Sequence, residues 1–127
     1  MPTETTFTLD TSSVKYGPGA TREVGHDMRQ WGAKRVMVVT DPRDSEPVQL
    51  ALASLRAEGL DAVLYDGVRV EPTDHSMQEA IGFAADGRFD GFVPVGGGSS
   101  IDTAKVANLY STYPAEFLTY VNAPIGR

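Results

Sequence analysis

The sequence predicts an α/β fold in which a parallel β-sheet carries helices on both faces. Short β-rich runs alternate with helical stretches along the chain, an order typical of successive strand–helix–strand units. Two of these runs, at 35–39 and 91–95, are almost continuously apolar, as expected of strands that are buried on both faces. The chain has 127 residues, which is enough for one domain with a core and too few for two substantial ones.

The N-terminal third begins with weak strand signals. Residues 5–10 and 13–16 are predicted to form short strands, and a turn is expected at 17–19, where two glycines flank a proline. A helix is predicted over 21–31, and Gly32 is placed as the residue that follows its end, because glycine tolerates the left-handed backbone found there.

The middle of the chain supplies two further helices. One opens at Pro47, because proline favours the first helical position, and ends at Gly59. Its apolar face is expected to contain Val48, Leu52 and Leu55. A strand at 62–65 follows, and Thr73 is predicted to cap the next helix. The apolar residues of that helix follow the helical period: Met77, Ala80, Ile81 and Ala84.

The C-terminal third is expected to pass from the strand at 91–95 through a glycine loop directly into a helix. The apolar positions of this helix are Ile101, Ala104, Val106 and Ala107. Beyond Tyr110 the pattern weakens, so that 116–121 fits either a helical turn or a strand. Residues 124–127 are predicted to form a loop.

Composition excludes several functional classes. The net charge of −6 disfavours nucleic acid and anionic membranes as partners, because the long-range field repels polyanions. The absence of cysteine excludes disulfides, thiolate zinc sites and cysteine nucleophiles. The N-terminus lacks the basic and apolar regions of a signal peptide, and no apolar run approaches the ~20 residues that span a bilayer. We therefore expect a soluble, cytoplasmic protein.

The glycine loop is the strongest functional signal. Gly96, Gly97 and Gly98 let backbone amides approach a ligand, and the following helix adds unpaired amides and the positive end of its dipole. Together they suit a pyrophosphate, at the strand edge where ligands of open α/β sheets bind. The alternative is a tight turn in which Ser99 caps the helix and Asp102 completes a capping box. Both interpretations can hold together.

Asp41 is the second candidate, because it stands just past the strand at 35–39. A carboxylate in that position is the usual partner of an adenosine ribose diol, and it repels a 2′-phosphate, which would favour NAD over NADP. The alternative is that Asp41 and Pro42 only initiate a turn, with a solvated carboxylate. The sequence leaves both alternatives open.

No catalytic or metal-binding residue is predicted. His26 and His75 are expected on helix surfaces and lack the spacing of a metal site. No Ser, His and Asp residues pair as nucleophile and base.

Several stretches resemble the iron-containing alcohol dehydrogenase family, namely residues 39–41, 65–73 and 96–105, the last reading Gly-Gly-Gly-Ser-Ser-Ile-Asp-Thr-Ala-Lys. Others are similar to one branch of that family, the hydroxyacid–oxoacid transhydrogenases, namely 68–74, 107–110 and 120–126. The resemblance implies a Rossmann-like NAD-binding domain over residues 1–127, cut off before the helical domain that follows in the family. It implies that Gly96 to Ser99 bind the pyrophosphate, that Asp41 contacts the adenosine ribose, and that Asp102 lies along the nicotinamide side.

The branch oxidises 4-hydroxybutyrate to succinate semialdehyde and reduces 2-oxoglutarate to 2-hydroxyglutarate, with a bound NAD carrying the hydride. The iron or zinc of the family is held in the helical domain by an aspartate and histidines that this chain does not contain. The resemblance therefore implies a chain that binds NAD and is inactive alone. Two alternatives remain: a standalone nucleotide- or phosphate-binding module, and an inactive fragment. A hydroxyacid, oxoacid or alcohol is the expected substrate class, and a homo-oligomer is left open.

Overall fold

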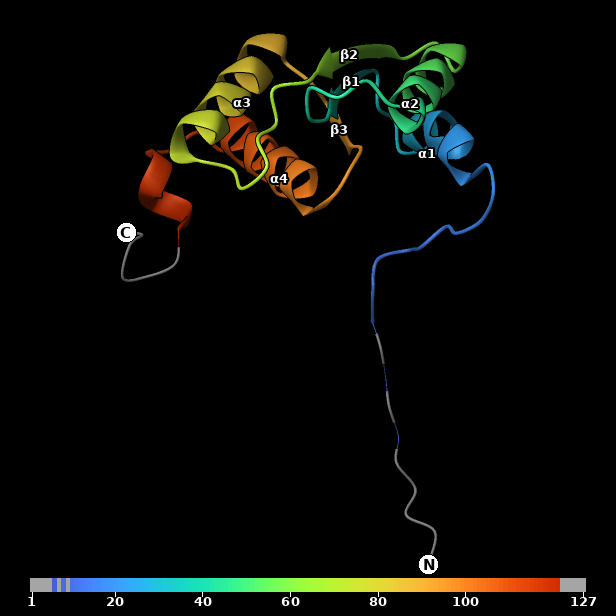
Figure 1. Cartoon of the computed structure of the whole chain (residues 1–127), viewed down its shortest axis with the longest axis horizontal. Helices are drawn as coiled ribbons and strands as arrows, with labels where there is room; N and C mark the ends of the chain where they lie inside the picture. Colours follow the sequence, from blue (N-terminus) through green and yellow to red (C-terminus); the bar gives the residue numbers. More distant parts are fainter. Residues whose placement is uncertain (1–5, 7, 9, 122–127) are drawn as a thin grey trace, which may run out of the picture.

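A computed structural model describes residues 6, 8 and 10–121, and its centre is a three-stranded parallel sheet (Figure 1). The strands are β1 (Arg35–Val39), β2 (Asp61–Tyr65) and β3 (Gly91–Pro94), in the spatial order β2-β1-β3. The α-helices are α1 (Val24–Gln30), α2 (Glu46–Ala57), α3 (Asp74–Gly87) and α4 (Gly98–Thr112). Two 3₁₀ turns complete the order, η1 (Ala20–Glu23) and η2 (Phe117–Tyr120). The predicted α/β class with a parallel sheet is confirmed.

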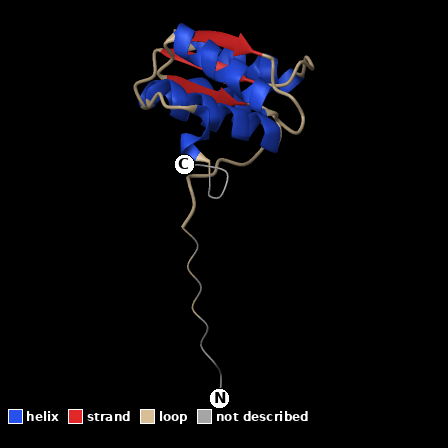
Figure 2. Ribbon diagram, turned by 90° about the vertical axis from the view of Figure 1, so that its left-hand side faces the viewer, coloured by secondary structure: helices blue, strands red, loops and turns tan. Residues whose placement is uncertain are grey.

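The sheet lies between two helical layers, with α1 and α2 on one face and α3 and α4 on the other (Figures 1 and 2). Successive side chains of a strand point to opposite faces. Val36 and Val38 therefore pack under α1 and α2, whereas Met37 and Val39 pack under α3 and α4. All four side chains are fully buried, which explains why the β1 sequence is continuously apolar.

The direction of the crossovers reverses at β1. The chain passes from β1 through α2 to β2 on one face, then returns through α3 on the other face and crosses β1 to reach β3. The loops that follow β1 and β3 consequently lead to helices in opposite layers. This divergence opens a crevice at the carboxyl edge of the sheet, the place where open α/β sheets bind ligands.

Local signals fix the helix ends. Gly32 and Gly59 have positive φ angles of 85° and 78° and follow α1 and α2, as predicted. Gly32 N–H donates to the carbonyl of Arg29 (3.0 Å) and Ala33 N–H to that of Met28 (3.1 Å), the pairing that satisfies a helix C-terminus. Thr73 caps α3 as predicted, through reciprocal hydrogen bonds with Ser76.

Some predicted elements are different in the structure. The strand predicted at 13–16 is wrong: this segment is extended and exposed, and no strand of the described residues lies beside it to accept its hydrogen bonds. Part of the predicted strand at 5–10 lies outside the described residues, as does the loop predicted at 124–127. Residues 116–121 contain a helical turn, η2, which decides between the two alternatives.

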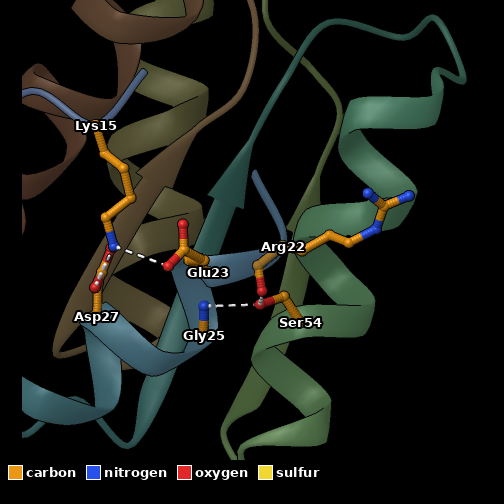
Figure 3. Close-up of polar contacts among 6 residues, drawn as sticks. All are labelled: Lys15, Arg22, Glu23, Gly25, Asp27 and Ser54. Atoms are coloured by element: carbon orange, nitrogen blue, oxygen red, sulfur yellow. Dashed lines mark hydrogen bonds and ion pairs between the residues drawn. The ribbon is translucent and has the colours of Figure 1, made fainter. Parts of the chain in front are cut away.

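Helices α1 and α2 are joined by a polar contact around Ser54 (Figure 3). The Gly25 N–H donates to Ser54 Oγ (2.9 Å), and Ser54 Oγ donates to the Arg22 carbonyl (2.6 Å). The two backbones are so close that a Cβ on Gly25 would lie 2.1 Å from the Ser54 carbonyl oxygen. Nearby, Lys15 pairs with Asp27 (2.9 Å) and ties the N-terminal segment to α1.

We predict that Gly25→Ala destabilises the fold by about 1–3 kcal/mol, because the methyl group collides with backbone that a rotamer change cannot move. The matched control is Gly82→Ala in α3, where an added Cβ meets nothing within 4 Å. That change should stabilise by up to about 1 kcal/mol through helix propensity. Urea unfolding monitored by circular dichroism measures both, and equal effects at the two glycines would refute the close α1–α2 contact.

Candidate functional site

A pocket of about 500 Å³ lies at the carboxyl edge of the sheet, between the ends of β1 and β3. Its lining comes from the loop after β1, the start of α2 and the loop after β3: Thr40, Asp41, Arg43, Asp44, Ser45, Pro47, Val95 and Gly96. We call it the carboxyl-edge pocket. Its volume lies within the range of about 300–1,000 Å³ typical of small-molecule sites. Two of the predicted site residues, Asp41 and Gly96, meet here although they are distant in the sequence.

The three glycines of the loop have different reasons for lacking a side chain. Gly96 has a φ of 140°, and a Cβ there would lie 2.8 Å from Ser100 Oγ, so the fold itself requires glycine. An added Cβ on Gly97 or Gly98 would meet nothing within 4 Å. Packing therefore makes no demand for glycine at these two positions. Because Gly97 and Gly98 have no side chains, the space over the loop backbone stays open, and a ligand can approach it there.

Helix α4 begins without a side-chain cap. Its N-cap is Gly97, whose backbone is extended, and the first turn starts at Gly98. The predicted capping box of Ser99 and Asp102 is wrong, because Ser99 already lies inside the first helical turn and is not the residue before it. The first amides of a helix have no intrahelical acceptor. In α3 the Thr73 side chain accepts from one of them, the Ser76 N–H, whereas no side chain caps the start of α4.

The remaining predicted residues lie beside the carboxyl-edge pocket, outside its lining. Ser99 is half-buried, and its carbonyl accepts a hydrogen bond from Thr103 Oγ1 (2.7 Å). Asp102 is exposed on the second turn of α4. The structure thus brings Asp41 to the glycine loop and leaves Asp102 facing solvent.

The Asp41 carboxylate is held by Arg43. Its Oδ1 accepts hydrogen bonds from the Arg43 backbone N–H (2.9 Å) and from Nε (3.0 Å), and its Oδ2 accepts one from Nη2 (2.6 Å). The backbone bond forms the turn expected of an Asp-Pro sequence. The side chain of Asp41 is only 17% exposed, so the carboxylate is paired and not solvated. Hydrogen bonds from Arg43 lower the pKa of Asp41 to about 2, which keeps it ionised.

Arg43 is a site residue that was not predicted from the sequence. Its signal is an arginine two residues after an aspartate in a turn that directly follows a buried strand, since such a turn brings the residue i+2 back to the aspartate. Thr40 anchors the start of this loop: its N–H donates to the Tyr65 carbonyl (2.9 Å), and its carbonyl accepts from Val68 N–H (3.2 Å). The loop that carries Asp41 and Arg43 is therefore fixed by main-chain bonds at its base.

Within residues 6, 8 and 10–121, no three His, Cys, Asp or Glu side chains are grouped as a metal site requires. An iron or zinc site therefore does not fit the described residues. His75 pairs instead with Glu79 (3.2 Å) on the surface of α3. In the same part of the chain, no helix is long and apolar enough to cross a membrane.

Residues 11–126 match the sequence profile of a family described as iron-containing alcohol dehydrogenase. The hydroxyacid-oxoacid transhydrogenases of Xenopus laevis and Homo sapiens, both named as mitochondrial, are 52% and 50% identical over 98% of this chain. The chain spans only 28% and 27% of the length of these relatives.

Solved structures agree in fold. The NADH-dependent butanol dehydrogenase A of Thermotoga maritima has a TM-score of 0.80 and 21% identity, over 91% of this chain and 30% of its own. At that identity the likeness concerns the fold alone. A 1,3-propanediol oxidoreductase has a TM-score of 0.78 and 30% identity, over 84% of this chain and 28% of its own.

Arg43→Ala should raise the pKa of Asp41 from about 2 toward its ordinary value of 3.8, because the guanidinium hydrogen bonds that favour the ionised form are lost. The rise is partial, since the backbone N–H of residue 43 still donates. The Asp41–Arg43 pair therefore stabilises the folded state at pH values above 3.8, the ordinary pKa of an aspartate. This contribution to the free energy of unfolding is lost as the pH falls through the folded-state pKa of about 2. A carboxyl ¹³C NMR titration of Asp41 measures the shift, and an unchanged pKa would show that the pair does not form in solution.

Proposed function

This chain belongs to the iron-containing alcohol dehydrogenase family, and from that premise we propose that it is the NAD-binding portion of a hydroxyacid–oxoacid oxidoreductase. About half of its residues are identical to those of named transhydrogenases. Because it spans little more than a quarter of their length, the activity is proposed for the longer protein. The proposed reaction passes a hydride from 4-hydroxybutyrate to 2-oxoglutarate through bound NAD.

The observation that carries the proposal is the uncapped start of α4, which directly follows Gly96 of the carboxyl-edge pocket. In the proposed complex, the amides of the first turn donate to the pyrophosphate, whose negative charge is also favoured by the helix dipole. Gly97 and Gly98 keep the space above those amides open. NAD, when bound, supplies the group that accepts and returns the hydride.

The ends of the dinucleotide are assigned from the same geometry. We place the adenosine ribose at Asp41, whose ionised carboxylate can accept a hydrogen bond from a ribose hydroxyl. Asp102 is proposed to lie along the nicotinamide side, on the exposed turn of α4. No catalytic step is assigned to a metal in this chain, because the described residues supply no site for one.

The substrate, the cellular location and the oligomeric state are proposals or predictions as well. The substrate class is a small hydroxyacid, oxoacid or alcohol, as the names of the relatives indicate. The relatives are named as mitochondrial, so the cytoplasmic location expected from the N-terminal sequence stays a prediction. A homo-oligomer also stays a prediction. A nucleotide-binding module without catalysis would use the same pocket and differ only in lacking turnover.

Calorimetric titration with NAD tests the glycine loop. Gly98→Ala should weaken NAD binding at least about tenfold, because the methyl group would occupy the space that the phosphate needs. The free energy of unfolding should not fall, since the added Cβ meets no protein atom. Gly82→Ala, equally unhindered but on α3, is the matched control and should bind NAD like the wild type. Equal affinity of the Gly98→Ala and wild-type chains would refute the pyrophosphate assignment.

Asp41→Ala should reduce the affinity for NAD by about tenfold, because a ribose hydroxyl loses its charged acceptor. The same titration with NADP should show a smaller loss, since the 2′-phosphate replaces one of the hydroxyls that could donate to the carboxylate. An unchanged ratio of the two affinities would remove Asp41 from the ribose site.

A further inference from the structure

Arg43 occupies the acceptor positions that a ribose diol would need on Asp41. A carboxylate oxygen has two lone-pair directions. Both directions of Asp41 Oδ1 are taken by Arg43, one by its backbone N–H and one by Nε. Oδ2 already accepts from Nη2 and has one direction left. A diol bound through both hydroxyls needs one free direction on each oxygen, so this carboxylate is prepared for only one hydroxyl.

The Asp41–Arg43 contact also places a cation at the carboxyl-edge pocket, where Asp41 alone would supply only negative charge. The side chain of Arg43 is 80% exposed, and it lines the carboxyl-edge pocket together with Asp41 and Gly96. A guanidinium has five N–H donors, of which Asp41 uses two. Three N–H groups on Nη1 and Nη2 donate to no acceptor among the described residues. Arginine binds phosphate oxygens through parallel N–H donors, and these three remain for that purpose.

Arg43 changes the charge that Asp41 presents to a ligand, although other carboxylates lie nearby. Asp41 and Arg43 form a neutral pair, so the repulsion that an isolated Asp41 would exert on a phosphate is offset. The other carboxylate of the pocket, Asp44, accepts a hydrogen bond from Gln49 Nε2 (2.8 Å) on α2. The amide of Gln49 is neutral, so Asp44 keeps its negative charge, and Asp66 lines an adjoining pocket together with Arg43. Neither carboxylate is hydrogen-bonded to Arg43, whose only carboxylate partner among the described residues is Asp41.

We propose that Arg43 makes the adenosine end of this site accept a 2′-phosphate, so that the chain binds NADP with an affinity close to that for NAD. The inference rests on the proposed function, because it takes the adenosine ribose to lie at Asp41. With NADP, Arg43 donates its free N–H groups to the 2′-phosphate while its fork neutralises Asp41. With NAD, one ribose hydroxyl donates to the remaining acceptor of Oδ2. Arg43 is thus a specificity-determining residue, and Asp41 alone does not set the preference.

The test is the ratio of the dissociation constants for NADP and NAD, measured by calorimetry on the 127-residue chain. The wild-type ratio should lie within about tenfold of one. Arg43→Ala should raise the ratio at least about tenfold, because NADP loses its cation and meets an unpaired Asp41. Arg43→Lys should restore part of the NADP affinity, since lysine keeps the charge and loses the fork.

Arg29→Ala is the matched control. Arg29 is also an exposed arginine paired with a carboxylate, Glu58 (3.2 Å), but it lies on α1 and does not line the pocket. This variant should leave both dissociation constants unchanged. Raising the salt concentration should lower the affinity of the wild type for NADP more than its affinity for NAD, because salt screens the attraction between the 2′-phosphate and the guanidinium.

The outcomes separate the two proposals. If the wild type binds NAD but binds NADP with an affinity at least about a hundredfold lower, the proposed role of Arg43 is overturned and the NAD site still stands. A ratio that Arg43→Ala does not change overturns it as well. If neither dinucleotide binds at millimolar concentration, the proposed function fails and this inference fails with it. The wild-type ratio decides the matter even if a variant does not fold.

Discussion

Burial of β1 on both faces is the constraint from which the arrangement of the other elements follows. Four successive side chains of this strand, Val36 to Val39, are fully buried, and they can be so only if helices cover the sheet on each side. At about 25 cal/mol per Å² of apolar surface, this central strand contributes more per residue than an edge strand of similar length. The helices that follow β1 and β3 leave toward opposite layers, and the pocket lies at the strand ends where they diverge.

The candidate site is made mainly of backbone. Gly96 turns the chain with a φ that other residues rarely adopt, Gly97 ends the turn, and α4 starts with amides that no side chain caps. Opposite this positive helix end stands the Asp41–Arg43 pair, which fixes one carboxylate and exposes one guanidinium. An acidic chain can thus provide a local anion site, because backbone amides and a single exposed cation act at short range.

Local signals made most of the fold predictable. The apolar run of β1, the glycines after α1 and α2, and the Thr73 cap all act within a few residues, and each was found where predicted. The strand at 13–16 failed because a strand needs a distant partner that alternation alone cannot reveal. The Ser99 cap failed because the Gly96 turn starts α4 early. Arg43 was missed because its role depends on how a turn folds back on Asp41.

The central claim is that a dinucleotide binds where the glycine loop meets the loop after β1. Amide chemical shifts of the ¹⁵N-labelled chain, followed by NMR during titration with NAD, test it most directly. The account predicts that the largest shifts occur at residues 97–100 and at Asp41. Largest shifts at the separate pocket beside β2 and α3, which includes Tyr65, Glu79 and Asp86, would contradict it. So would a spectrum that millimolar NAD leaves unchanged.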